Sequence, residues 1–519
     1  MKIINLLFVF FLITNFGSAE MPKVRSQELT RSEQNSSYKN KIMYEVFIRS
    51  FFDSNKDGIG DIKGLNEKLP YLKNLGIEGI WMLPISPSPS YHKYDVTDYY
   101  SIDSVYGNKL DWFSLVETAN ALDIKLIIDV VLNHCSSQHP WFLNAKKSAT
   151  SKYRNYFVWK KAKDIDSEPE HWYFPKDEKG NPIGDEKYYA FFWSEMPDLN
   201  FDNLQVREEA IKIGKYWLTE MKADGFRLDA AQHIFPEGQE EKNHLWWREF
   251  RKAMDETKDH FYMVGEIANK NEKIAPYLVK GLNSAFNFDL ASDIISTTLS
   301  GVNNGIIDDL IKIRNLYLST SSSFLDATFI TNHDQDRILS DLNGDVNKAK
   351  MAAALLLTLP GSPYIYYGEE IGMLGKKPDE MIREPFMWSS ESNYVGQTNW
   401  EVSVNSTLQS VIPLDQQMND SLSIYSLYKN LIALRKSTAA LNGDTLINVK
   451  TEDEHIVAYK RSNGVESVLV VCNMGKDDVN SKIQLDGLTM QKIYGTNRCS
   501  INMNQLDIAG YSFAVFKIQ

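Results

Sequence analysis

The segment KLIIDVVLNH at residues 125–134 decides the fold class of this chain. After Lys125 it is an apolar run broken only by Asp129, a pattern typical of a parallel strand buried on both faces. Similar runs recur along the chain, separated by helix-like stretches. Because strands that alternate with helices indicate βαβ units, eight such runs predict a (β/α)8 TIM barrel of the α/β class. The predicted strands are 42–48, 79–83, 125–131, 225–228, 261–264, 284–288, 327–331 and 363–367.

One long segment interrupts this alternation. Residues 135–198 lie between the third and fourth predicted strands and are rich in Trp, Tyr, Lys and Pro. Because this segment is too long for an ordinary loop, it predicts a small inserted domain. The barrel is therefore expected to be built from two parts of the chain, residues 40–134 and 199–438.

The last part of the chain has a different pattern. Segments 455–459 and 465–471 alternate like strands on either side of Asn-Gly at 463–464, a strong hairpin-turn signal. A final strand is expected at 512–518. These features predict a C-terminal antiparallel β-sandwich domain at residues 439–519.

The N-terminus has the pattern of a secretory signal peptide at residues 1–19. A basic start at Lys2 is followed by an apolar run at 6–13 and by small residues up to Ala19. This run is too short to span a bilayer, and no later stretch approaches the ~20 apolar residues that a span requires. We therefore expect a secreted protein, extracellular or periplasmic, without a membrane anchor, in which residues 20–39 are a linker.

Composition narrows the choice of partners. Hydrophobic residues make up 43% of the 519 residues and charged residues 24%, as in a soluble globular protein. The formal net charge of -12 argues against nucleic acid or an anionic membrane as partner, since both need a basic surface. We expect a monomer with no nucleic-acid partner.

The cysteines are too few for a disulfide framework. Cys135 is expected to be a buried small residue. Cys472 and Cys499 both fall in the C-terminal region, and the sequence leaves open whether they pair.

Acidic residues stand repeatedly at the ends of predicted strands, where a TIM barrel places its catalytic groups. Asp129 follows the third strand, Asp229 the fourth, Glu266 the fifth and Asp334 the seventh. Carboxylates that converge on one barrel mouth repel one another and destabilise the fold unless a ligand, a cation or a reaction uses them. The pattern therefore predicts a site whose chemistry needs carboxyl groups.

Glycoside hydrolysis needs such a set. One carboxylate attacks or supports the oxocarbenium-like carbon and another carboxyl protonates the leaving oxygen, so their pKa values must differ. Arg227 precedes Asp229 by two residues, so the two side chains share a strand face and the guanidinium favours the ionised carboxylate. Glu266 has no cation beside it in the sequence, and we expect it to stay protonated and act as the acid.

Four segments together carry a family resemblance. DVVLNH at 129–134, GFRLDAAQH at 225–233, GE at 265–266 and NHD at 332–334 are similar to the signature regions of the α-amylase family, glycoside hydrolase family 13. They occur in the order expected for the family, and each falls at the end of a different predicted strand. The resemblance extends over residues 40–519 and implies the barrel, the inserted domain and the C-terminal β domain.

The resemblance also implies roles at matching positions. Asp229 would be the nucleophile that forms a covalent glucosyl-enzyme, and Arg227 would orient it. Glu266 would be the general acid and then the base, while Asp334 would hold sugar hydroxyls and help distort the ring. The other implied sugar contacts are Tyr94, which matches a stacking tyrosine, Asp95, His134, His333 and, beyond the cleavage point, His233.

A second constellation, DSNKDGIGD, lies at residues 53–61. Oxygen ligands at alternating positions around a Gly turn suit Ca²⁺, but Gly64 stands where an EF-hand loop has its bidentate Glu. The segment resembles instead the calcium loop of oligoglucosidase-like and related amylase members of the family. The implied ligands of a structural Ca²⁺ are the side chains of Asp53, Asn55, Asp57 and Asp61 and the carbonyl of Ile59. A second calcium site, suggested by Asn133 and His233, stays open because its ligands in the inserted domain are not identified.

Short segments favour one activity within the family. MPDLN at 196–200 and REPF at 383–386 resemble an intermediary bacterial group whose members are mostly α-amylases. Oligo-1,6-glucosidases tend to carry Val where this chain has Ala230, which favours α-1,4 bonds. Gln232 departs from the usual Lys and leaves the contacts of the leaving sugar open.

We therefore predict an α-amylase that cleaves α-1,4 bonds of starch-like glucans and maltooligosaccharides. The first alternative is an exo-acting α-glucosidase, or an oligo-1,6-glucosidase or transglycosylase, acting on short α-glucans. A non-catalytic family member is a further alternative, but it would need a lost acid or a membrane anchor.

Overall fold

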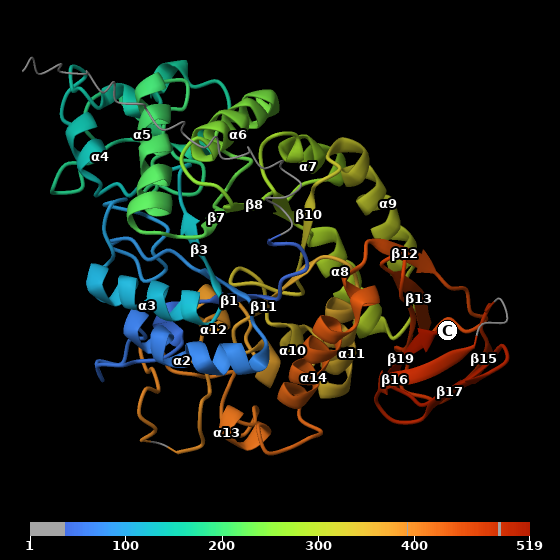
Figure 1. Ribbon diagram of the computed structural model, residues 1–519. Coiled ribbons are helices and arrows are strands. Elements are labelled where there is room, and N and C mark those ends of the chain that lie inside the picture. Colours follow the sequence, from blue (N-terminus) through green and yellow to red (C-terminus); the bar gives the residue numbers. More distant parts are fainter. Residues whose placement is uncertain (1–36, 392, 486–488) are drawn as a thin grey trace, which may run out of the picture.

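The computed structural model describes residues 37–391, 393–485 and 489–519. At its centre is a closed barrel of parallel strands (Figure 1), in the order β1-β11-β10-β9-β8-β7-β3-β2. This confirms the predicted TIM barrel, and each of its strands overlaps a predicted run. The barrel strands are β1 (Met43–Val46), β2 (Gly79–Met82), β3 (Lys125–Val130), β7 (Gly225–Leu228), β8 (Tyr262–Gly265), β9 (Ser284–Phe286), β10 (Leu325–Thr328) and β11 (Ser362–Tyr366).

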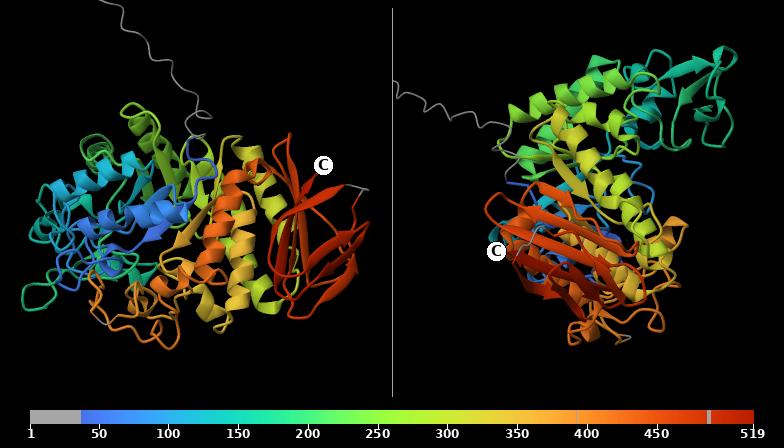
Figure 2. Two further views of the ribbon diagram at one scale, coloured as in Figure 1. Left: turned by 60° about the horizontal axis from the view of Figure 1, so that its bottom comes forward. Right: turned by 90° about the vertical axis from the view of Figure 1, so that its right-hand side faces the viewer.

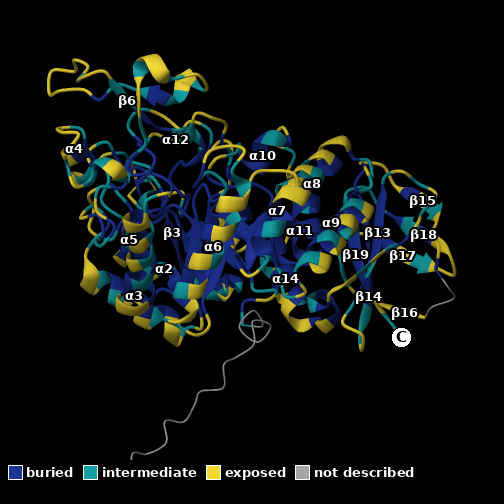
Figure 3. Ribbon diagram, turned by 90° about the horizontal axis from the view of Figure 1, so that it is seen from above, coloured by how far each residue is buried: buried dark blue, intermediate teal, exposed yellow. Residues whose placement is uncertain are grey.

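Helices surround the barrel and bury its outer face, so the strands are buried on both sides (Figure 3). Local chemistry fixes several helix ends. Asn108 and Asp111 form a capping box at the start of α3, while Asp61 caps α2, which ends at Gly76 in the left-handed conformation with φ 107°. The longer helices are α2 (Ile62–Leu75), α3 (Lys109–Ala121), α5 (Leu204–Lys215), α6 (Glu240–Asp255), α8 (Phe288–Ser300), α9 (Ile306–Thr320), α11 (Val346–Thr358) and α14 (Ile424–Ser437). The shorter helices are α7 (Asn271–Ile274), α10 (Ile338–Asp341), α12 (Asp379–Ile382) and α13 (Leu414–Gln417).

The segment between β3 and β7 forms a small unit that stands at the edge of the barrel mouth (Figures 2 and 3). It contains α4 (Pro140–Ala145) and a sheet in the order β4-β6-β5. An isolated bridge from His134 to Asp198 joins its two ends, and a second bridge pairs Phe157 within the segment with Leu199. The strands of its sheet are β4 (Trp159–Lys161), β5 (Trp172–Tyr173) and β6 (Glu186–Tyr189).

The C-terminal region packs its antiparallel sheets beside α11 and α14 (Figure 2). The predicted strands at 455–459, 465–471 and 512–518 correspond to β13, β14 and β19. The Asn-Gly signal does mark the turn, but the loop spans residues 463–466 because the N–H of Asn463 bonds to the carbonyl of Glu466. The two sheets have the orders β12-β13-β14-β19-β16 and β15-β18-β17. Their strands are β12 (Thr445–Asn448), β13 (Ile456–Ser462), β14 (Ser467–Asn473), β15 (Val479–Lys482), β16 (Met490–Gly495), β17 (Cys499–Asn502), β18 (Gln505–Ile508) and β19 (Ser512–Ile518).

Cys135, Cys472 and Cys499 are all buried and free. Cys472 lies on β14 and Cys499 on β17, and the two thiols are unpaired in the structure. The expected signal peptide and most of the expected linker lie outside the described residues. Within the described part of the chain, no helix is long and apolar enough to cross a membrane.

Candidate active site

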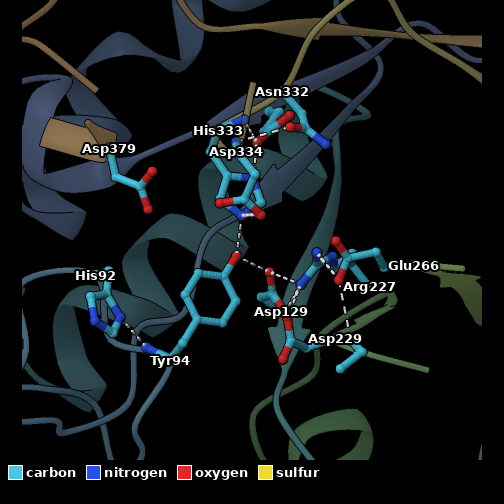
Figure 4. Close-up of polar contacts among 12 residues, drawn as sticks. His92, Tyr94, Asp129, Arg227, Asp229, Glu266, Asn332, His333, Asp334 and Asp379 are labelled. Carbon is cyan, nitrogen blue, oxygen red and sulfur yellow. Dashed lines mark hydrogen bonds and ion pairs between the residues drawn. The ribbon is translucent and has the colours of Figure 1, made fainter. Parts of the chain in front are cut away.

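The strand-end carboxylates meet at one mouth of the barrel (Figure 4). Parallel pairing brings their backbones into register. The N–H of Asp229 bonds to the carbonyl of Val130 on β3 at 3.3 Å, and the N–H of Glu266 bonds to that of Leu228 on β7 at 3.0 Å. The side chains of Asp229 and Glu266 therefore project side by side at the carboxyl ends of neighbouring strands.

Arg227 on β7 connects these carboxylates and is almost fully buried, with 1% of its side chain exposed. Its Nη1 lies 2.6 Å from Oδ1 of Asp229 and 3.0 Å from both carboxylate oxygens of Asp129. Its Nη2 lies 2.8 Å from Oε2 of Glu266. One guanidinium thus fixes three carboxylates from three neighbouring strands, as Figure 4 shows.

Glu266 has no cation beside it in the sequence, but in the structure Arg227 reaches it from the adjacent strand. Burial raises the pKa of Glu266 above its ordinary value; Arg227 opposes this, while Asp229 and Asp334 add to it. Burial also raises the pKa of Asp229, against the charge and the hydrogen bond of Arg227. The Glu266 side chain is the more exposed, at 24% against 10% for Asp229.

Asp334 and His333 follow β10 and form a second ion-pair group. His333 Nδ1 lies 2.7 Å from Oε1 of Glu45, and its Nε2 lies 3.1 Å from Oδ2 of Asp334. Burial lowers the pKa of His333, but Asp334 and Glu45 raise it to about 9, so the ring is cationic at neutral pH. Burial raises the pKa of Asp334, but His333 and Arg383, whose Nη2 lies 2.9 Å away, hold it below its ordinary value.

Tyr94 connects the two groups. Its hydroxyl donates to Oδ2 of Asp129 at 3.1 Å and lies 2.6 Å from Nε2 of His333, and its ring stacks on that imidazole. His134 is buried beside the Tyr94 carbonyl, and burial lowers the pKa of its ring to about 4, so it is neutral. Asp95 is buried and accepts a hydrogen bond from the Ser88 hydroxyl at 2.5 Å.

His233 lies on the connection from β7 to α6. The chain turns there through Ala230, a non-glycine residue with a positive φ of 45°. The ring of His233 stacks on Phe191 of the inserted segment, with centroids 4.2 Å apart. The two rings line a cavity of about 230 Å³ between that segment and the barrel.

Residues 53–61 form one loop between β1 and α2, and its acidic side chains bind backbone N–H groups of the loop. Asp53 accepts from Asn55, Lys56 and Gly58, and Asp61 accepts from Ser54 and Gly64. The all-oxygen donor set fits Ca²⁺. Among the described residues, however, no three acidic, His or Cys side chains are grouped closely enough to form a metal site.

The suggestion of a second calcium site rests on Asn133 and His233. Oδ1 of Asn133 is buried without a hydrogen-bond partner among the described residues, and the Asn133 side chain bonds to Asp198 at the end of the inserted segment. Burial raises the pKa of Asp198 to about 8. Asp198 and His233 line the same cavity, so the structure brings a carboxyl of the inserted segment to this place.

The site contains three groups that the sequence alone did not identify as functional. Asp129 was recognised only as a strand-end residue, yet it binds Arg227 and Tyr94. Glu45 on β1 and Arg383 beyond β11 position His333 and Asp334 from distant parts of the chain. Of these two, only Arg383 carried a sequence signal, because it opens the REPF segment at 383–386.

Comparisons with known proteins identify the family of this chain. The chain matches the family described as alpha amylase, catalytic domain, over residues 45–444. It is 43% identical over 481 residues to Alpha-amylase 3 of Dictyoglomus thermophilum, covering 93% of this chain and 94% of that protein. It is 31% identical to a 4-alpha-glucanotransferase of Thermotoga neapolitana, covering 87% and 98%. The crystal structure of the alpha-amylase from H. orenii superposes with a TM-score of 0.84 at 39% identity, covering 93% of this chain and all of that one. The chain therefore belongs to the α-amylase family of glycosidases.

Proposed function

We propose that this protein is a retaining α-amylase that cleaves internal α-1,4 bonds of starch-like glucans and maltooligosaccharides. The observation that carries the proposal is the single guanidinium of Arg227, shared by Asp229 and Glu266 at the ends of adjacent strands. Retention needs two carboxyls ~5–5.5 Å apart, and a shared guanidinium favours such close spacing.

In the first half of the reaction, an oxygen of Asp229 attacks the anomeric carbon while the glycosidic C–O bond breaks. Glu266 gives its proton to the leaving oxygen, which departs as a hydroxyl. The result is a glycosyl ester on Asp229. Arg227 orients both carboxyls in the ground state, and Asp334, kept ionised by His333 and Arg383, accepts hydrogen bonds from sugar hydroxyls.

In the second half, water gives a proton to Glu266 and its oxygen attacks the same carbon, releasing Asp229 as a carboxylate. Two displacements at one carbon restore the original anomeric configuration. If a sugar hydroxyl replaces water, the product is a new glycosidic bond. This is the basis of the second candidate function, a transglycosylase acting on short α-glucans, which the glucanotransferase relative favours.

Two features outside the catalytic group complete the proposal. The loop at residues 53–61 would hold a structural Ca²⁺ through oxygen donors, fixing the connection from β1 to α2. The N-terminal signal pattern at residues 1–19 would direct the protein out of the cytoplasm. Mass spectrometry of the mature N-terminus tests the second point, since cleavage after Ala19 leaves Glu20 first.

A time course on soluble starch and on maltotriose tests the activity, with Asp229→Asn as control. For an endo-acting α-amylase, the iodine colour falls quickly while few reducing ends appear, and the control is inactive. If glucose appears from maltotriose while starch stays nearly intact, the exo-acting candidate replaces this proposal.

A further inference from the structure

Strand β1 places one buried carboxyl beside the catalytic group. Glu45 is 1% exposed, and its Oε1 lies against the segment that follows β10. This oxygen accepts the backbone N–H of His333 at 3.1 Å and lies 2.7 Å from Nδ1 of the same residue. The two contacts fix both the backbone and the angle of the ring. The double displacement at Asp229 and Glu266 does not use Glu45, so this carboxyl has a different role.

The opposite edge of the ring faces a second carboxyl. Nε2 of His333 lies 3.1 Å from Oδ2 of Asp334 and 2.6 Å from the Tyr94 hydroxyl, which donates its proton to Asp129 (Figure 4). A carboxylate, or a hydroxyl oxygen whose proton is already donated, can only accept, so Nε2 must donate. Nδ1 must donate to Glu45 for the same reason. An imidazole with a proton on both nitrogens is a cation.

Charged groups reach this ring from several elements. Burial of the ring lowers its pKa, yet the two flanking carboxylates, Asp334 and Glu45, raise the pKa of His333 to about 9. Arg383, beyond β11, donates to the carbonyl of His333 at 2.9 Å and pairs with Asp334, so it belongs to the same ion-pair group. From β2, the uncharged Trp81 meets the ring edge-on. The remaining charged groups of the site stand at the ends of β3, β7 and β8 and are Asp129, Arg227, Asp229 and Glu266.

The ring itself is buried beneath the groups that meet the substrate. The His333 side chain is 0% exposed, whereas that of Asp334 is 44% exposed and Tyr94 is half-buried. A sugar in the site therefore contacts Asp334 and Tyr94, and the ring acts on it mainly through them. As a cation, the ring attracts the lone pairs of both groups to Nε2. This keeps the Tyr94 proton on Asp129 and the Asp334 carboxylate in one orientation.

We propose that Glu45 is a positioning residue that keeps His333 doubly protonated, and that the cationic ring in turn orients the groups that hold the sugar. The inference rests on the proposed function and adds to it a residue that touches neither substrate nor reacting atoms. When the ring loses its second proton, Nε2 becomes an acceptor and faces the lone pairs of Asp334. The Tyr94 hydroxyl then turns from Asp129 to Nε2. Glu45 thus sets the pH above which these groups lose their arrangement.

The first test measures pH profiles of kcat/KM on α-maltosyl fluoride. Fluoride leaves without a proton from the enzyme, so the alkaline limb of this profile does not depend on Glu266 as acid. Glu45→Gln keeps an oxygen for the N–H groups of His333 but removes the charge. We expect its alkaline limb to move down by about 1–2 pH units, while kcat/KM at pH 6 stays within about threefold of wild type. An equal loss at every pH would mean a purely structural role and overturns the inference.

Two further variants complete this test. Glu45→Asp keeps the charge on a shorter side chain, and its alkaline limb should lie closer to that of wild type than the limb of Glu45→Gln does. Glu78→Gln is the matched control, because Glu78 accepts the N–H of Ile42 just before the other end of β1, and its profile should match wild type. If Glu78→Gln moves the limb as far as Glu45→Gln, the shift reflects overall charge and overturns the inference.

A second measurement does not depend on activity. Nitrogen NMR of the protein labelled in its nine histidines, with His333→Asn to identify the signal, shows whether both ring nitrogens carry protons. We expect the doubly protonated ring at pH 7, and a neutral ring at that pH overturns the inference even if the enzyme is an α-amylase. A wild-type enzyme that cleaves neither α-maltosyl fluoride nor starch overturns the proposed function instead, while NMR still decides the state of the ring.

Discussion

At the scale of single residues, the site depends on a guanidinium that holds three carboxylates at once. Lysine at position 227 would keep a charge but lose the planar fork that bonds Asp229 and Glu266 through separate nitrogens. We expect Arg227→Lys to lower kcat on maltoheptaose by about 10²–10³ with little change in KM, as when a preorganised electrostatic contact is lost. Arg207→Lys, at an exposed ion pair with Glu249, is the control and should stay near wild type. Equal activity of both variants would contradict the role given to Arg227.

A second prediction at this scale concerns Glu369, which is buried after β11 and accepts the Tyr428 hydroxyl at 2.7 Å. Burial raises the pKa of Glu369 to about 8, against the hydrogen bond from Tyr428. Between the unfolded pKa of about 4.3 and pH 8, the folded state therefore keeps a proton that the unfolded state has lost. Stability falls as pH rises through this window, with a slope of up to about 1.4 kcal/mol per pH unit from this group.

Glu369→Gln removes that proton exchange and keeps an oxygen for Tyr428. We measure the free energy of unfolding in urea at pH 6, 7 and 8. Relative to wild type, we expect this free energy to rise in the variant by about 1 kcal/mol per pH unit. Glu452→Gln, at an exposed position, serves as control, and its free energy of unfolding should have the same pH dependence as that of wild type. If the free energy of unfolding of Glu369→Gln also has the same pH dependence as that of wild type, Glu369 does not titrate as its burial implies.

Contacts between residues close in the chain were predictable from the sequence, and contacts between distant residues were not. Asp229 and Arg227 lie on one strand two residues apart, so their contact follows from strand geometry. Glu45 and His333 are 288 residues apart and meet because β1 and β11 close the barrel, which no local pattern indicates. For the same reason the contact between Glu266 and Arg227 was missed, since it crosses between two strands.

At the scale of elements, the loop at residues 53–61 makes a direct prediction. It precedes α2 and supplies the α2 cap through Asp61, so a bound ion would stabilise the start of that helix. We expect excess EDTA to lower the melting temperature and Ca²⁺ to restore it, with about 2.7 kcal/mol of stabilisation at a hundredfold excess over Kd. Asp57→Ala, at an exposed position of the loop, should abolish the response, and Glu67→Ala on the exposed face of α2 should keep it. Identical melting with EDTA and with Ca²⁺ would exclude a structural ion in this loop.

Element boundaries were predicted less well than element types, and β10 shows why. The apolar run at 327–331 indicated a strand, but β10 spans Leu325–Thr328. The residues beyond it leave the ladder because Asn332, His333 and Asp334 are held in a turn by Glu45 and by their own side chains. Functional geometry at the barrel mouth overrides the apolar pattern there.

At the scale of the whole molecule, a buried arginine joins the barrel to the C-terminal sheets. Arg461 on β13 donates to the carbonyls of Thr358 at the end of α11, Leu441 and Gly443. Arg461→Met leaves these carbonyls unsatisfied, and we expect it to lower the free energy of unfolding by about 3–5 kcal/mol. Lys460→Met, on the next residue of β13, should change it by less than about 0.5 kcal/mol. If urea unfolding gives similar free energies of unfolding for the two variants, the junction between the barrel and the C-terminal sheets does not depend on Arg461.

If Asp229 and Glu266 act in a double displacement, the anomer that the enzyme releases first has the configuration of the substrate. Proton NMR during the first turnovers on maltoheptaose distinguishes the newly formed reducing ends before they mutarotate. We expect the α-anomer to appear first and to convert slowly to the equilibrium mixture. Initial release of the β-anomer would mean inversion and would contradict the role of Asp229 as nucleophile.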